Sequence, residues 1–160
     1  MKYTLAGLLL LRLGLPARGQ YIELPQGTFL DTSSARNPAC ATARYARYYQ
    51  VKGKYPRSSD TLRKMARAFL QQQHHTYTGS GYVTFRFVID CAGHREPRTQ
   101  VLQTGTAYQR TTFAPTLVAD LYAFLQTLTD WQVAQASVPV KYLTYLNFKL
   151  QDGQVVAVTP

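Results

Sequence analysis

The sequence predicts an α+β fold in which a small antiparallel β-sheet of three or four strands packs against two α-helices. Residues 82–89 and 140–150 alternate apolar with polar side chains, as strands with one buried face do. Residues 59–73 and the stretch after Pro115 repeat apolar side chains every three or four positions, which indicates helices. Because short turns join the predicted strands, we expect antiparallel pairing.

Length and charge limit what the chain can be. Its 160 residues, 46% of them hydrophobic and 16% charged, fit one compact domain and exclude a large multidomain enzyme. The 18 Lys and Arg residues against 8 Asp and Glu residues give a formal net charge of +10. This balance favours an anionic partner such as nucleic acid, a lipid headgroup or a polysaccharide, without choosing among them.

Residues 1–19 have the form of a secretory signal peptide. Lys2 precedes an apolar run over residues 5–11, and the small residues Ala17 and Gly19 close the segment. We expect cleavage after Gly19 and export to the periplasm. Arg12 interrupts the run, so an uncleaved inner-membrane anchor is the weaker interpretation. The mature chain would carry 15 basic and 8 acidic side chains, a net charge of +7.

Residues 20–54 form a basic N-terminal segment that precedes the main unit at 55–160. Residues 20–35 are rich in turn-forming side chains, and no element is predicted there. Basic residues and tyrosines then alternate, which suits phosphate contacts and stacking, although a solvated face of a strand and helix is the simpler explanation. The candidate polyanion ligands are Arg44, Arg47, Lys52, Lys54 and Arg57.

The two cysteines of the chain, Cys40 and Cys91, are compatible both with a disulfide in an oxidising compartment and with two free thiols. Neither belongs to a C-x-x-C motif, so a zinc site or a redox motif is not indicated.

The first helix is predicted over residues 59–73. Tyr55-Pro56 precedes it and Ser58 or Ser59 caps it. Its apolar stripe consists of Leu62, Met65, Ala66, Phe69 and Leu70.

A β-hairpin follows the first helix. Strand 82–89 turns at residues 90–94 and returns over residues 98–104, before a loop at 105–112. The second helix opens at Thr112 and Pro115, and Trp131 after it is predicted to plug the core. The apolar stripe of this helix is Leu117, Val118, Leu121, Phe124, Leu125 and Leu128.

The last long strand is predicted over residues 140–150. Asp152-Gly153 is a strong hairpin signal, so residues 155–158 should return as a short strand. One face of the long strand carries Tyr142, Thr144, Leu146, Phe148 and Leu150.

The sequence offers no catalytic motif. It contains no phosphate-binding loop, dinucleotide fingerprint, zincin motif or nucleophile elbow. His74 and His75 diverge on a linker, so together with His94 they do not indicate a metal site. Asp90 and Glu96 flank the hairpin turn, where turn chemistry explains them better than acid–base catalysis. We predict no enzyme activity, no cofactor, no metal and no small-molecule substrate.

Several pieces occur in the order found in one known family. They are GYVTFRFVID at residues 81–90, Gly93, Val101-Leu102, the helix with Phe113 and Leu117, Trp131, VPV at 138–140 and YLNFKL at 145–150. With Tyr55-Pro56 and the first helix upstream, residues 55–150 resemble the TonB C-terminal domain family.

The resemblance implies a non-enzymatic periplasmic domain whose small sheet is backed by two helices. It also implies binding of an extended segment of an outer-membrane transporter, which adds as a strand beside the last family strand. An open strand edge offers unpaired N–H and C=O groups for such pairing. The strand returning after Asp152-Gly153 would compete for that edge. The implied contact residues are Val140, Lys141, Tyr142, Leu143, Thr144, Tyr145, Leu146, Asn147, Phe148 and Lys149.

Two hypotheses for function result. The first is a TonB-C-like interaction domain that binds an envelope protein, such as an outer-membrane transporter, by strand addition. The alternative is a secreted basic module that binds a polyanion, namely nucleic acid, lipopolysaccharide or polysaccharide, through the Arg-, Lys- and Tyr-rich segment 36–67. Of these polyanions, nucleic acid is the least expected. A homodimer formed by strand exchange is a further physical option.

Overall fold

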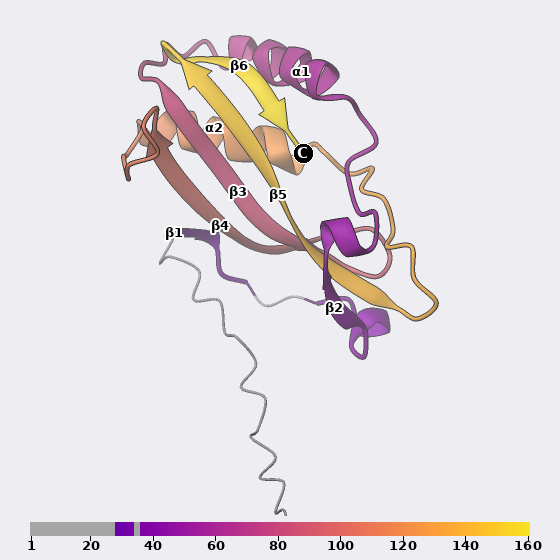
Figure 1. Cartoon of the computed structure of the whole chain (residues 1–160). Helices are drawn as coiled ribbons and strands as arrows, with labels where there is room; N and C mark the ends of the chain where they lie inside the picture. The colour runs from indigo at the N-terminus through magenta and orange to yellow at the C-terminus, as the bar shows by residue number, and fades with distance from the viewer. Residues whose placement is uncertain (1–27, 34–35) are drawn as a thin grey trace, which may run out of the picture.

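The computed structural model describes residues 28–33 and 36–160. The predicted signal peptide, residues 1–19, lies outside the described residues. The fold is α+β with two α-helices, as predicted, but its sheet has six strands rather than three or four (Figure 1). The helical and strand elements are β1 (Thr28–Asp31), η1 (Pro38–Cys40), β2 (Arg44–Arg47), η2 (Tyr48–Gln50), α1 (Ser59–Gln72), β3 (Gly81–Ile89), β4 (Arg95–Gly105), α2 (Pro115–Gln126), β5 (Val140–Gln151) and β6 (Gln154–Thr159).

The strand order is β1-β4-β3-β5-β2, and β6 also pairs with β5. Every pairing is antiparallel except that of β2 with β5, which is parallel. The prediction missed β1 and β2 because each has only four residues, almost all exposed, and so lacks the alternation that marks a half-buried strand. β4 also begins earlier than predicted, at Arg95.

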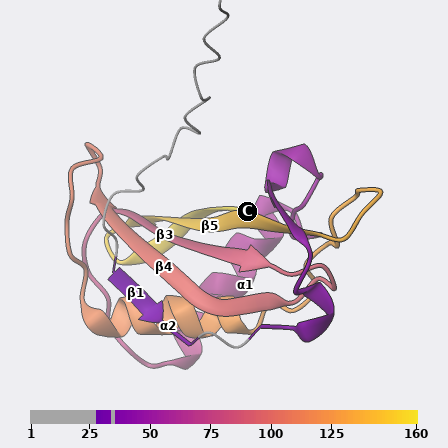
Figure 2. The same cartoon turned by 90° about the horizontal axis from the view of Figure 1, so that it is seen from below.

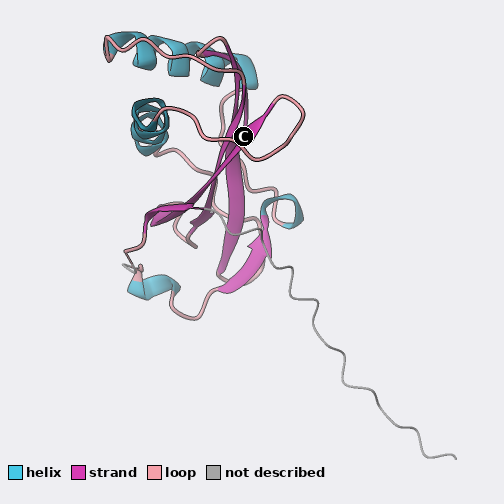
Figure 3. Cartoon of the chain, turned by 90° about the vertical axis from the view of Figure 1, so that its left-hand side faces the viewer, coloured by secondary structure: helices cyan, strands magenta, loops and turns pink. Residues whose placement is uncertain are grey.

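Both α-helices lie on one face of the sheet (Figure 3), and the view from below shows α2 running along that face (Figure 2). Ser58 caps α1, because its side chain accepts a hydrogen bond from the Thr61 N–H at 3.2 Å. The predicted stripe of α1 is buried at Leu62, Ala66 and Leu70, whereas Met65 is exposed.

The core lies between the helices and the inner face of the sheet. Trp131 is buried against Tyr55 and Phe87, and its indole N–H donates to the Leu128 carbonyl at 2.9 Å, as expected of a core plug. The sheet contributes the predicted alternating side chains of β3 and β5: Val83, Phe85, Phe87, Ile89, Tyr142, Thr144, Leu146, Phe148 and Leu150.

A disulfide joins Cys40 of η1 to Cys91 in the turn after β3, with the Cα atoms 5.6 Å apart. Asp90 beside it is buried and accepts hydrogen bonds from the N–H groups of Ala92 and His94 and from the Asn37 side chain. Burial opposes the charged carboxylate, but these hydrogen bonds outweigh it and lower the pKa of Asp90. Asp90 therefore acts in the turn, as its position in the sequence suggested.

Within the described part of the chain, none of the helices combines the length and apolarity needed to span a bilayer.

Candidate functional site

The outer edge of β5 was the predicted docking edge, and in the folded chain most of it is occupied. β2 pairs with residues 140–143 and β6 pairs with residues 147–151. Among the described strands, only the stretch at 144–146 has no neighbour on that side, and η2 contacts β5 there through the rings of Tyr48 and Tyr145. An added strand could therefore reach β5 only where β2 or β6 leaves.

The side chains of the predicted edge also differ from one another in role. Lys141 is buried, lies 3.8 Å from the Glu96 carboxylate and sits 4.3 Å from the centre of the Tyr45 ring. Lys149 is exposed at the other end of β5. Lys141 is thus a structural contact between β4, β5 and β2 rather than a free cation.

The predicted polyanion ligands do not come together in one hollow. All five side chains are exposed, and Arg47 alone among them lines one of the hollows described below. The positions of the others, Arg44, Lys52, Lys54 and Arg57, are spread from β2 to the start of α1.

The outer face of the sheet, opposite the helices, carries a groove that crosses several strands. In register, Phe29 of β1, Gln100 of β4, Arg86 of β3 and Tyr145 of β5 form one row. Beside it, Val88, Leu143 and Arg47 form a second row from β3 through β5 to β2. We use the name outer-face groove for these two rows together with the side chains that flank them, which are Arg36, Tyr45, Tyr48, Tyr49, Glu96 and Arg98.

Two hollows make up the outer-face groove, and they share Arg86 and Leu143. The hollow toward β1 has a volume of about 430 Å³, and the hollow toward η2 about 400 Å³. Further lining side chains are Phe29, Arg36, Tyr45 and Arg98 in the first hollow and Arg47, Tyr48, Tyr49 and Tyr145 in the second.

Positive charge collects in the groove without matching acids. Among residues 28–33 and 36–160, no carboxylate forms an ion pair with any of its four arginines. Glu96, which also lines the groove, is paired with Lys141. Arg98 lies 4.6 Å from the centre of the Phe29 ring, and Arg47 donates to the Tyr49 hydroxyl at 3.2 Å. The groove is therefore electrostatically suited to an anion.

Arg86 is the central cation of the groove. Its side chain is half-buried, and burial, followed by the nearby positive charge of Arg47, lowers its pKa. Arginine nevertheless stays protonated in proteins, so two like charges are held together on a partly desolvated surface. A bound anion would offset the repulsion between these two charges.

Sequence reasoning missed Arg86, Arg98, Arg36 and Tyr145 as a group. Arg86 stands on the outward row of β3, which the alternation reveals, but only the strand register places it between Gln100 and Tyr145. The contribution of β1 could not be found, because that strand itself was not predicted.

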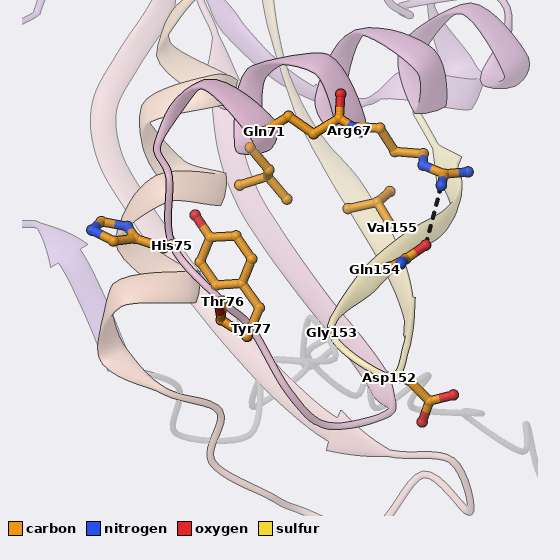
Figure 4. A pocket seen from close by; sticks show the side chains of 10 residues that line it. Arg67, Gln71, His75, Thr76, Tyr77, Asp152, Gly153, Gln154 and Val155 are labelled. Atoms are coloured by element: carbon orange, nitrogen blue, oxygen red, sulfur yellow. Dashed lines mark hydrogen bonds between the residues drawn. The ribbon is translucent and has the colours of Figure 1, made fainter.

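A further hollow, of about 370 Å³, lies between α1, the linker after it and the β5–β6 turn (Figure 4). Several of its polar side chains are engaged within the chain. Arg67 donates to the Gln154 side chain at 3.1 Å, and the Tyr77 hydroxyl donates to Asp120 at 2.8 Å. His75 also contacts Asp120 at 2.8 Å, whereas His94 lies 3.7 Å from Asp90. We interpret these contacts as structural.

In the described parts of the chain, no three His, Cys, Asp or Glu side chains are grouped so that they could hold a metal ion. Comparison with protein-family models, with curated proteins and with solved structures finds no match. The fold and the site define an α+β chain with both helices on one sheet face and a basic, aromatic groove on the other.

Proposed function

We propose that this chain is an exported, non-catalytic interaction domain of the TonB C-terminal type, which binds an extended segment of an envelope protein by strand addition. Support comes from the order α1, β3, β4, α2, β5 along the chain, with both helices on one face of the sheet, because this is the order that the resemblance implies. The proposed binding edge is residues 140–143 of β5, and β2 would have to leave it.

The observation that carries the proposal is the weak attachment of β2. It has four residues, three of them exposed, and only Ala46 packs against the core. β6, in contrast, buries Val155 and Val158. Of the two strands beside β5, β2 is the one that a partner could replace.

Replacing one strand by another costs little in backbone hydrogen bonding. Each ladder hydrogen bond contributes only about 0.5–1.5 kcal/mol net, and the incoming strand restores those that β2 gives up. The exchange does lose side-chain contacts. Tyr45 of β2 would leave Lys141, and Tyr48 of η2 would leave Tyr145. Partner side chains would have to compensate for these.

The test is to lock each strand in place with a disulfide. Arg44→Cys with Val140→Cys would pin β2, and Gln151→Cys with Gln154→Cys would pin β6, since these positions are paired in the sheet. A partner is first captured from an envelope extract with the mature chain and identified by mass spectrometry, and its binding segment is then made as a peptide.

We expect the β2-locked chain to lose peptide binding and the β6-locked chain to keep it. Hydrogen exchange should show that peptide binding exposes the amides of Arg44–Arg47 while residues 140–143 stay protected. Equal binding by both locked chains would reject strand addition at this edge.

Polyanion binding by the basic segment is the second candidate, because Arg44, Lys52, Lys54 and Arg57 are all exposed. Phosphate neutralisation releases counterions, so binding to lipopolysaccharide vesicles would fall steeply with salt. Lys52→Gln with Lys54→Gln should then weaken binding to the vesicles. Peptide binding by strand addition should be unaffected by these two substitutions.

A further inference from the structure

The outer-face groove is a second candidate binding surface, which lies on the face of the sheet and shares Leu143 and Tyr145 with the β5 edge. It exists while β2 is in place, since Arg47 of β2 and Tyr48 of η2 form one wall. Strand addition requires β2 to leave. Groove binding and strand addition therefore exclude each other in one molecule, and either one can fail its own test while the other holds.

We infer that the outer-face groove binds an extended peptide segment in which an Asp or Glu side chain lies between apolar residues. The carboxylate would meet Arg86, where the two hollows join, and the flanking apolar side chains would enter the hollows on either side. The planar guanidinium fork matches the two oxygens of a carboxylate, so this contact is selective as well as attractive.

Charge is the first argument for an acidic ligand. Arg86, Arg47, Arg98 and Arg36 all line the groove, and in the described portion of the chain none of them has a carboxylate partner. The one acid in the groove, Glu96, is already held by Lys141 at 3.8 Å. An incoming carboxylate would thus complete an unbalanced cluster rather than displace an existing pair.

The shape and the apolar walls favour a peptide over a nucleic acid. The hollow of about 430 Å³ is bounded by Phe29 and Leu143, and the hollow of about 400 Å³ by Leu143 and Tyr145. Volumes of this size fit the range of pockets that receive small ligands or side chains. Lys52, Lys54 and Arg57, which would extend a track for successive phosphates, do not line the groove.

The test is fluorescence anisotropy with a labelled peptide, acetyl-Ala-Phe-Glu-Leu-Ala-amide, and the same peptide with Gln in place of Glu. The mature chain should bind the Glu peptide roughly tenfold to hundredfold more tightly than the Gln peptide, as expected for charge-assisted hydrogen bonds to one carboxylate. Arg86→Gln should abolish this preference, and Arg86→Lys should restore part of it. Arg110→Gln, which removes an exposed charge on the β4–α2 loop, should leave the preference intact.

The peptide comparison needs no variant, so it remains decisive even where Arg86→Gln fails to fold. Equal affinity for the two peptides, or no binding of the Glu peptide, would overturn the inference. A single-stranded oligonucleotide with several phosphates is the competitor. If it displaced the Glu peptide, and if Lys52→Gln with Lys54→Gln weakened peptide binding as much as Arg86→Gln, the groove would be part of a polyanion surface instead.

Discussion

β2 and β6 both pair with β5 through backbone hydrogen bonds, but their side chains bury very different amounts of apolar surface. β6 contributes Val155 and Val158 to the core, at 1% exposure each, and packs under α1. β2 pairs in parallel and leaves Arg44, Tyr45 and Arg47 exposed. Hydrogen bonding alone therefore does not decide how firmly a strand is held. The apolar surface that its side chains bury decides it.

The largest expected effect tests this difference directly. Val158→Asp would place a carboxylate in the core and should lower the free energy of unfolding by at least about 4 kcal/mol, or prevent folding. Tyr45→Asp on β2 should cost less than about 1 kcal/mol, because it removes an exposed ring and one cation–π contact. Urea unfolding followed by circular dichroism measures both. Similar losses for the two variants would contradict the comparison.

The next effect concerns the disulfide, whose Cys40 lies shortly before β2 in the chain. Cys40→Ser with Cys91→Ser should lower the free energy of unfolding by about 2–4 kcal/mol. Hydrogen exchange of this variant should increase at the amides of Arg44–Arg47 more than at those of Gln154–Thr159. An equal increase in the two strands would show that the disulfide acts only on the fold as a whole.

A smaller effect depends on pH. The pKa of Asp90 is lowered in the folded chain, so its stabilisation is present above the unfolded value of about 3.9 and is lost as the pH falls through the folded pKa. Asp90→Asn should cost about 1–2 kcal/mol at neutral pH. The variant should also lose less stability than the wild type on acidification. Urea unfolding at neutral and at acidic pH gives both quantities. If the free energies of unfolding of the wild type and of Asp90→Asn differed by the same amount at every pH, Asp90 would not be the group that titrates.

The smallest effect on stability should sharpen the proposed function. Tyr48→Ala removes the edge-to-face contact with Tyr145, at 5.5 Å between ring centres, and this contact contributes about 0.5–1.5 kcal/mol beyond the area that the ring buries. Because this contact helps to hold β2 in place, the same variant should bind a strand-adding partner more tightly. Isothermal titration with the partner peptide checks this, and unchanged or weaker affinity would argue against displacement of β2.

The sequence was most informative where side chains alternate over a long element. The outward and inward rows of β3 and β5, both helices and the position of Trp131 were predicted because burial on one face leaves a regular pattern. β1 and β2 left no such pattern, since they are short and exposed. Their absence from the prediction made the edge of β5 look open.

The outer-face groove was harder to predict than the fold, because it depends on pairing between distant segments. Phe29, Arg86 and Tyr145 are widely separated in the sequence, and only the register of four strands places them in one row. The basic segment was noticed for its local density of charge. However, local density marks exposed residues, while the groove collects single arginines from several elements.

The anchoring of β2 at both ends has a further consequence. Upstream, Cys40 is fixed by the disulfide; downstream, Val51 and Tyr55 are buried in the core. A displaced β2 would remain tethered at both ends. It would compete with the partner at an effective concentration of about the millimolar range, as for short flexible linkers. This tether would set the affinity that a partner segment needs in order to displace β2, so weakly binding segments would be rejected. After the partner leaves, β2 would pair with β5 again rapidly. Cutting the chain once between Cys40 and Arg44 would lower this required affinity without altering any contact of the partner.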